Sequence, residues 1–191
     1  MGHRLTQIYT RTGDGGTTSI GTGDRIAKDD LRVHLMGELD ELNAWVGLIL
    51  AHPLQSGHRA CLEEIQHLLF DLGGDLAIPG RHTLKLEYIE WLERWMDFFN
   101  DTLPPLKEFV LPGGSERSGL AHLARTRCRK AERTAVHFQR EATLPAFTLE
   151  WLNRLSDFLF VFSRVLAKED QDAEVLWMPK ARTLPEPSGS I

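Results

Sequence analysis

The chain has 191 residues, of which 42% are hydrophobic, and a formal net charge of -5. A chain of this length can form one domain with its own buried core, and the acidic balance argues against nucleic-acid or membrane-surface partners. Cys61 and Cys128 lie far apart without Cys-x-x-Cys spacing, so we expect buried thiols in a reducing compartment. No signal-peptide pattern and no membrane-spanning apolar run is present, so we expect a cytoplasmic protein.

The first segment, residues 10–25, reads TRTGDGGTTSIGTGDR and contains five glycines and five threonines. It has too few apolar residues to bury, so we expect residues 1–27 to form a Gly-rich loop outside the core. Glycines allow turns that aim backbone N–H groups at an anion, and threonine hydroxyls and Lys28 add donors for phosphate. No Gly-Lys-Ser/Thr follows, which excludes a Walker A loop. The alternative is a disordered N-terminal tail.

Five amphipathic helices are predicted after this loop. Apolar residues recur at helical spacing over about residues 29–51, 58–76, 86–102, 116–140 and 147–168, with Pro or Gly between most of these ranges. Short connections between helices are typical of an all-α bundle. We therefore expect one domain over residues 1–191, with a five-helix bundle over residues 28–170 and a loose tail over residues 171–191.

The fourth predicted helix is strongly basic. It contains seven Arg or Lys residues and one acid from Arg117 to Arg140, and Ser115 is a plausible N-cap before it. Arg125, Arg129 and Arg133 recur every fourth residue on one face. This pattern is compatible with a solvated face, with carboxylates opposite the arginines, or with a bound polyphosphate.

Two further segments offer candidate polar residues. In GELDELN, residues 37–43, Asp40 and Asn43 lie on one side of the first helix and could face the arginines. In LEWLNRLSDFLFVFSR, residues 149–164, Asn153 and Asp157 stand four residues apart. On spacing alone, these two side chains are expected to face solvent on the helix surface rather than to bind a ligand.

A ferritin-like di-iron bundle is a competing enzyme class. Glu64 and His67 have the Glu-x-x-His spacing that such sites use. A di-iron site needs a second copy of this motif on another helix, and the sequence contains none. We therefore expect Glu64 on the surface and His67 on a helix face.

Taken together, the motifs resemble the ATP:cob(I)alamin adenosyltransferases of the propanediol-utilisation type. The resemblance rests on TRTGDGGTTSIGTGDR with AKDDLRV, then GELDELN, then FVLPGGS with ARTRCRKAER, then LNRLSDFLF, and it covers residues 9–164. It implies a five-helix bundle that assembles as a homotrimer with active sites between subunits. It also implies binding of ATP, Mg²⁺ and cobalamin, with Mg²⁺ held mainly through the ATP phosphates and no direct protein ligand predicted.

The resemblance also implies roles for particular residues. The loop that wraps the triphosphate would contain Thr10, Arg11, Thr12, Gly13, Asp14, Gly16 and Thr18. Further ATP-binding residues would be Lys28, Arg125, Arg129, Glu132 and Asn153. Asp40 would pair with Arg125 across the subunit interface, and these two residues with Arg129 would serve catalysis. Phe109 would lie beside the corrin, where the lower ligand of cobalamin would otherwise sit; from the sequence alone it is expected in the core.

The implied reaction is attack by Co(I) on the 5′ carbon of ATP, which yields adenosylcobalamin and inorganic triphosphate. The cobalt is the nucleophile, so no side-chain nucleophile is required. Expected partners are a cob(II)alamin reductase and an adenosylcobalamin-dependent enzyme that accepts the product. The alternative function is an ATP-binding sensor or cobalamin-delivery protein without turnover.

Overall fold

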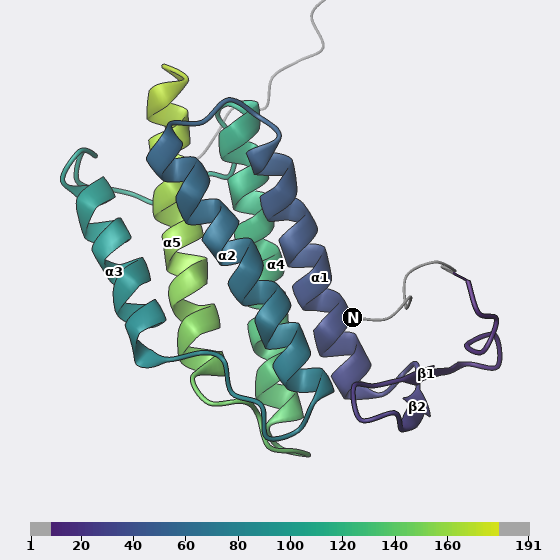
Figure 1. Cartoon of the computed structure of the whole chain (residues 1–191). Coiled ribbons are helices and arrows are strands. Elements are labelled where there is room, and N and C mark those ends of the chain that lie inside the picture. The colour runs from purple at the N-terminus through teal and green to yellow at the C-terminus, as the bar shows by residue number, and fades with distance from the viewer. Residues whose placement is uncertain (1–8, 180–191) are drawn as a thin grey trace, which may run out of the picture.

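Five α-helices lie side by side as a bundle in the computed structural model, which describes residues 9–179 (Figure 1). They are α1 (Leu31–Leu50), α2 (Ser56–Ala77), α3 (Leu86–Asn100), α4 (Glu116–Phe138) and α5 (Thr148–Glu169). Each begins and ends within a few residues of its predicted range, so the predicted five-helix bundle is confirmed. None of these helices has a stretch long and apolar enough to cross a bilayer.

Helices α4 and α5 together form the centre of the packing, and the other helices pack on one of them or on α1. Helix α5 contacts α3 on one side and α4 on the other, while α4 also packs on α1 and α1 on α2. Phe158 and Phe162 of α5 stack with ring centroids 5.6 Å apart, and Phe99 of α3 packs against both rings. Burying an aromatic side chain of this kind contributes about 1.5–3 kcal/mol to stability. This aromatic cluster therefore attaches α3 to the rest of the bundle.

Side-chain caps fix the starts of two helices that matter for the site. Asp30 precedes α1 and accepts a hydrogen bond from the backbone N–H of Arg32 at 2.8 Å. Ser115 precedes α4 and accepts from the N–H of Ser118 at 3.2 Å, which confirms the predicted N-cap. Such caps satisfy N–H groups that have no partner inside the helix.

The Gly-rich segment contains a short hairpin that the sequence analysis did not predict. Strands β1 (Thr17–Ser19) and β2 (Arg25–Ala27) pair antiparallel, with Thr18 opposite Ile26. Gly21, in the turn, donates its N–H to Ala77 O at 3.1 Å. A Cβ at Gly21 would lie 2.4 Å from Cγ1 of Ile78, so only glycine allows this close approach to the end of α2.

The segment after α5 also differs from the prediction. We expected residues 171–191 to be loose, yet residues 174–177 are held against the bundle. Val110 forms an antiparallel bridge with Leu176, and Trp177 donates its N–H to Phe109 O at 2.7 Å. Glu174 pairs with the buried guanidinium of Arg164. The remainder of the expected tail, residues 180–191, and residues 1–8 of the expected loop lie outside the described residues.

Cys61 and Cys128 are both buried free thiols, as expected. Burial raises the pKa of each thiol, so both stay protonated and unreactive at neutral pH.

Candidate functional site

Two arginines one turn apart on α4 have no carboxylate partner among residues 9–179. These are Arg125 and Arg129, and Nε of Arg125 is buried without a hydrogen-bond partner in the described part of the chain. Burial and, to a smaller extent, the neighbouring charge of Arg129 lower the pKa of Arg125. Leaving a buried donor unpaired costs about 1–3 kcal/mol. An anion placed against both guanidinium groups would remove this penalty.

The third arginine of this face has a different arrangement. Arg133 is exposed, and its Nη1 donates to the backbone carbonyl of Arg129 at 2.9 Å. Its charge therefore lies against its own helix.

Carboxylates from α1 do contact α4, but they pair with other cations. Glu38 lies 3.3 Å from Nζ of Lys130, and Glu41 lies 3.1 Å from Nε of Arg127. The hypothesis that carboxylates of GELDELN lie opposite Arg125, Arg129 and Arg133 is therefore wrong within one chain, because the carboxylates that reach α4 pair with Arg127 and Lys130.

Asp40 and Asn43 do not face the arginines. Asp40 is exposed on α1 and lines a groove between α1 and α2, beside Phe70. Nδ2 of Asn43 donates to the carbonyl oxygen of Gln66 on α2 at 3.2 Å. The expected pairing of Asp40 with Arg125 is absent from a single chain, and its formation between subunits stays a prediction.

Glu132 and Asn153 are brought together by the packing of α4 on α5. Nδ2 of Asn153 donates to Oε1 of Glu132 at 3.0 Å. Glu132 follows Arg129 by three residues, which places the two side chains on the same face of α4. Arg125, Arg129, Glu132 and Asn153 form a polar cluster, which we call the α4–α5 cluster. It contains four of the residues predicted to bind ATP.

The remaining predicted ATP-binding residues lie in the Gly-rich loop, except Lys28, which directly follows it. The positions from Thr10 to Gly16 form turns before β1 and are largely exposed, and Thr18 lies in β1. Lys28 donates its backbone N–H to Gly16 O at 2.9 Å, and its side chain passes over Gly13. A Cβ at Gly13 would lie 3.2 Å from Nζ of Lys28. The lysine charge therefore lies directly on the predicted phosphate loop.

Arg25 is a loop residue that the sequence analysis did not select. Its guanidinium donates to Oγ1 of Thr17 at 2.6 Å and to Oγ of Ser19 at 3.2 Å, and it also reaches the carbonyl of Thr12. These bonds connect β2 to β1 and to the turns before it. Arg25 gives the hairpin its shape, and no local sequence pattern distinguishes it from other loop arginines.

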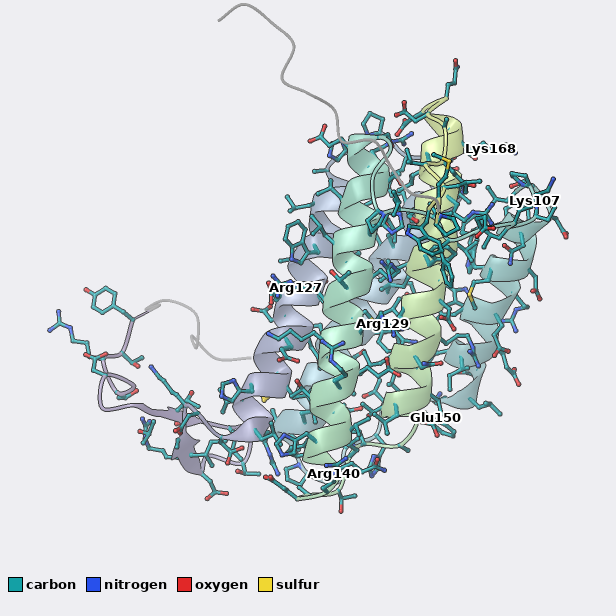
Figure 2. All side chains as sticks on the ribbon, turned by 180° about the vertical axis from the view of Figure 1, so that it is seen from behind. Lys107, Arg127, Arg129, Arg140, Glu150 and Lys168 are labelled. Carbon is teal, nitrogen blue, oxygen red and sulfur yellow. The ribbon has the colours of Figure 1, made fainter. Side chains whose placement is uncertain are left out.

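The loop and the α4–α5 cluster do not meet within one chain. The loop projects from the end of the bundle where α1 begins, whereas Arg129 lies midway along α4 (Figure 2). One chain therefore holds the two parts of the predicted ATP site at separate places.

An apolar pocket adjoins the α4–α5 cluster. It has a volume of about 620 Å³ and is lined by Leu106, Lys107, Glu108, Phe109, Val110, Pro112, Arg125 and Phe160. Phe109 is 79% exposed, so the expectation from sequence alone that it packs in the core is wrong. Its ring contacts Trp177 edge-on, with centroids 6.3 Å apart. Arg125 belongs to both the pocket and the cluster, so the two sites are continuous.

His122 is a second residue that the sequence analysis did not select. It is 4% exposed, its Nδ1 has no hydrogen-bond partner in the described part of the chain, and its ring lies 6.2 Å from that of Phe160. Burial and the charge of Arg125 lower its pKa to about 4. His122 is therefore neutral at physiological pH and adds no further charge beside Arg125.

The residues of the di-iron alternative are separate from this site. Glu64 and His67 are exposed on α2, as expected. Within residues 9–179 no group of three or more His, Cys, Asp or Glu side chains could hold a metal ion.

Comparison with known proteins shows extensive similarity. Residues 8–166 match the profile of the family described as cobalamin adenosyltransferase. The chain is 48% identical to a cobalamin adenosyltransferase of Cupriavidus metallidurans, over 93% of this chain and 97% of that protein. It is 45% identical to a corrinoid adenosyltransferase of Mycobacterium tuberculosis, over 94% and 96%. A variant PduO-type ATP:corrinoid adenosyltransferase from Lactobacillus reuteri, complexed with cobalamin and ATP, superposes with a TM-score of 0.84 and 38% identity, covering 90% of this chain and 99% of that chain.

Proposed function

Since the chain belongs to the cobalamin adenosyltransferase family, we propose that it transfers the 5′-deoxyadenosyl group of ATP to cob(I)alamin. The products are adenosylcobalamin and inorganic triphosphate. The observation that carries this proposal is the position of Arg125, which lines the apolar pocket and also belongs to the α4–α5 cluster. A triphosphate and a corrin bound at these adjoining sites would place the ATP sugar between them.

The reaction needs a stabilised leaving group rather than a protein nucleophile. The electron pair of Co(I) forms the bond to the 5′ carbon, the bond from that carbon to oxygen breaks, and triphosphate leaves with the bonding electrons. Arg125 and Arg129 have no carboxylate partner among residues 9–179 and would neutralise that charge, and Lys28 would supply a third cation. Charged donors of this kind contribute about 2–4 kcal/mol each at a transition state. Mg²⁺ would bind through the phosphate oxygens and further neutralise them.

Phe109 and Phe160 give the pocket an apolar wall. Both line the cavity beside Arg125. An apolar wall against cobalt would exclude water and the lower ligand, and the absence of axial donors makes cob(II)alamin easier to reduce. We assign this role to Phe109 because its ring is exposed to the pocket rather than packed in the core.

The active form is a homotrimer in this proposal. Its support is the separation of the Gly-rich loop from the α4–α5 cluster within one chain, which a neighbouring subunit could bridge. A second support is the groove between α1 and α2, where Phe70 is 78% exposed beside Asp40. An exposed apolar groove of this kind is typical of a subunit contact. There Asp40 would pair with Arg125 of the next subunit.

The reaction requires two further protein partners, one that supplies an electron and one that uses the product. A reductase must supply one electron to convert cob(II)alamin into the Co(I) nucleophile, and an adenosylcobalamin-dependent enzyme would accept the product. We propose that these steps take place in the cytoplasm, without nucleic-acid or membrane partners.

An anaerobic assay tests the function. The protein is mixed with chemically reduced cobalamin, ATP and Mg²⁺, while absorbance follows formation of the light-sensitive cobalt–carbon product and triphosphate is assayed separately. We expect product and triphosphate in equal amounts. ATP binding without product would favour the sensor or delivery alternative, and absence of ATP binding would overturn the proposal.

A further inference from the structure

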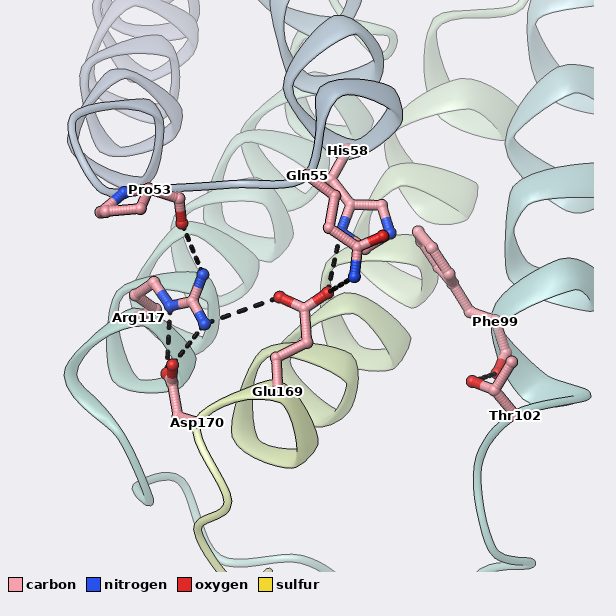
Figure 3. Close-up of polar contacts among 8 residues, drawn as sticks. All are labelled: Pro53, Gln55, His58, Phe99, Thr102, Arg117, Glu169 and Asp170. Atoms are coloured by element: carbon pink, nitrogen blue, oxygen red, sulfur yellow. Dashed lines mark hydrogen bonds and ion pairs between the residues drawn. The ribbon is translucent and has the colours of Figure 1, made fainter.

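A charged cluster outside the proposed site lies where α5 ends. It consists of His58 on α2, Arg117 on α4, and Glu169 and Asp170 at the end of α5 (Figure 3). Nε of Arg117 donates to Oδ2 of Asp170 at 3.1 Å, and its Nη2 donates to the other carboxylate oxygen. The same nitrogen lies 3.5 Å from Glu169, which in turn lies 3.2 Å from Nδ1 of His58.

Arg117 also holds a third part of the chain. Its Nη1 donates to the carbonyl of Pro53, in the loop between α1 and α2, at 2.6 Å. Its side chain is 14% exposed and that of Asp170 is 26% exposed, so the ion pair is partly shielded from water. The hydrogen bonds that Arg117 donates to Asp170 raise the pKa of Arg117 and lower the pKa of the Asp170 carboxyl, as expected for a strong charge-assisted pair.

The two ends joined by this pair lead to two segments that pair with each other, and one of them, the segment that contains Phe109, lines the pocket. Arg117 lies in the first turn of α4, directly after the segment that contains Phe109. Asp170 directly follows α5 as its C-cap, and the chain then turns at Gln171, which has a φ of 59°. The following residues return to that segment, where Leu111 donates its N–H to Val175 O at 2.8 Å. The Arg117–Asp170 pair therefore joins the helix that follows the Phe109 segment to the helix that precedes residues 175–177, and these two segments then pair at Phe109.

Burial does not fix the position of Phe109. Its side chain is 79% exposed, and its ring contact is with Trp177 of the paired segment. The position of the ring must therefore come from the backbone, and the backbone is held by the pairing with residues 175–177. This pairing depends on the relative position of α4 and the end of α5.

We propose that Arg117 is a positioning residue for the pocket wall at Phe109. It acts through Asp170, which sets how residues 175–177 meet the Phe109 segment, and it does not contact either substrate. The inference rests on the proposed function for its consequence in catalysis, but its structural part can be tested without any substrate. Without Arg117, the ion pairs that join Glu169 and Asp170 to the first turn of α4 would be lost, and the end of α5 would be free to move away from α4.

The structural part is tested by amide hydrogen exchange on the full chain without substrates. The amides of Leu111 and Trp177 report the pairing directly, because each donates across it. In Arg117→Met we expect these two amides to exchange at least about 10-fold faster, since local opening becomes easier. The matched control is Arg59→Met, because Arg59 binds the carbonyls of Leu50 and His52 next to the same α1–α2 loop and has no contact with Asp170.

The catalytic part is tested by steady-state kinetics with cobalamin and ATP varied separately. For Arg117→Met we expect KM for cobalamin to rise, or turnover from cob(II)alamin to fall, by about 10-fold, with KM for ATP changed less than about 2-fold. If the wall excludes axial donors, bound cob(II)alamin should give an electron paramagnetic resonance signal typical of cobalt without axial ligands, and this signal should weaken in the same variant. Arg117→Lys should recover part of both effects because it keeps the charge but loses the two-pronged contact.

Each outcome decides the inference. If Arg117→Met does not fold, Asp170→Asn removes the same charge pair and is expected to give the same changes at reduced size. Unchanged exchange at Leu111 and Trp177, or equal losses for ATP and cobalamin, would overturn the positioning role. Equal effects of Arg59→Met would show general destabilisation instead. Failure of the wild-type protein to make adenosylcobalamin would overturn the proposed function. The amide exchange of Leu111 and Trp177 would still test the structural part of the inference, because it needs no substrate.

Discussion

The amide of Asn153 on α5 donates a 3.0 Å hydrogen bond to the carboxylate of Glu132 on α4. This bond holds Glu132 toward α5, although Arg129 lies three residues before it on the same helix. Glu132 therefore leaves the guanidinium of Arg129 without a carboxylate partner among the described residues. The free cation is what a triphosphate would bind.

Replacing Asn153 should weaken ATP binding by releasing Glu132. In Asn153→Ala the carboxylate can turn to Arg129 and compete with phosphate. We expect the Kd for ATP, measured by calorimetry, to rise about 10-fold while cobalamin binding stays unchanged. An unchanged Kd for ATP would show that Glu132 and Asn153 lie outside the nucleotide site.

Replacing Arg125 should separate activity from stability. Arg125→Met removes a buried donor that has no partner within residues 9–179, and it removes the repulsion with Arg129. We expect turnover to fall about 30- to 1,000-fold. The free energy of unfolding in urea should stay constant or rise by up to about 1 kcal/mol.

Arg127→Met is the matched control for Arg125. It breaks an exposed pair with Glu41 and should lower stability by less than about 1 kcal/mol with turnover retained. A large loss of stability in Arg125→Met would contradict the view that this arginine is held for an anion.

A methyl group at Gly13 should disturb the phosphate loop. Its Cβ would lie 3.2 Å from Nζ of Lys28 and 3.3 Å from Thr17 O, so the lysine must move. We expect Gly13→Ala to weaken ATP binding about 3- to 10-fold without changing the unfolding free energy. Gly15→Ala is the control, because a Cβ there meets nothing within 4 Å. Equal effects at both positions would point to loss of loop flexibility instead.

Truncation of Phe109 should affect chemistry at cobalt more than stability. Because the side chain is 79% exposed, Phe109→Ala should lower the unfolding free energy by less than about 0.5 kcal/mol. Turnover that starts from cob(II)alamin should fall far more than ATP affinity. Phe98→Ala, at an exposed phenylalanine of α3, should leave both unchanged. Equal losses of turnover and ATP affinity in Phe109→Ala would contradict the proposed role.

Acid should destabilise the protein through His122. Its pKa falls from 6.5 in the unfolded chain to about 4 in the folded protein, so the unfolded chain binds more protons between these values. Stability contributed by the neutral ring is complete above pH 6.5 and is lost as the pH falls toward 4. At pH 5 we expect a loss of about 2 kcal/mol relative to pH 8.

Urea unfolding at pH 5 and pH 8 measures this effect in the wild type and in His122→Gln. His58 also has a pKa lowered by burial, so some loss at pH 5 should remain in the variant. An identical difference between the two pH values in both proteins would show that His122 does not titrate as expected.

The five helices and the basic face of α4 could be predicted from the sequence, because the patterns that indicate them involve residues close together in the chain. Apolar residues at helical spacing predicted all five helices, and Ser115 marked the start of α4. The same periodicity placed Arg125 and Arg129 on one face. The ordered motifs identified the family before any contact was known.

Tertiary structure alone decided which charges are paired and where the pocket lies. Glu41 reaches Arg127 rather than Arg125, and residues 175–177 pair with the segment that contains Phe109. These contacts join residues that are tens of positions apart, and their geometry depends on how α1, α4 and α5 pack. Local sequence preferences contain no information on contacts between distant residues. Phe109, an apolar residue before a turn, is therefore predicted in the core, although the packed helices leave it exposed beside the pocket.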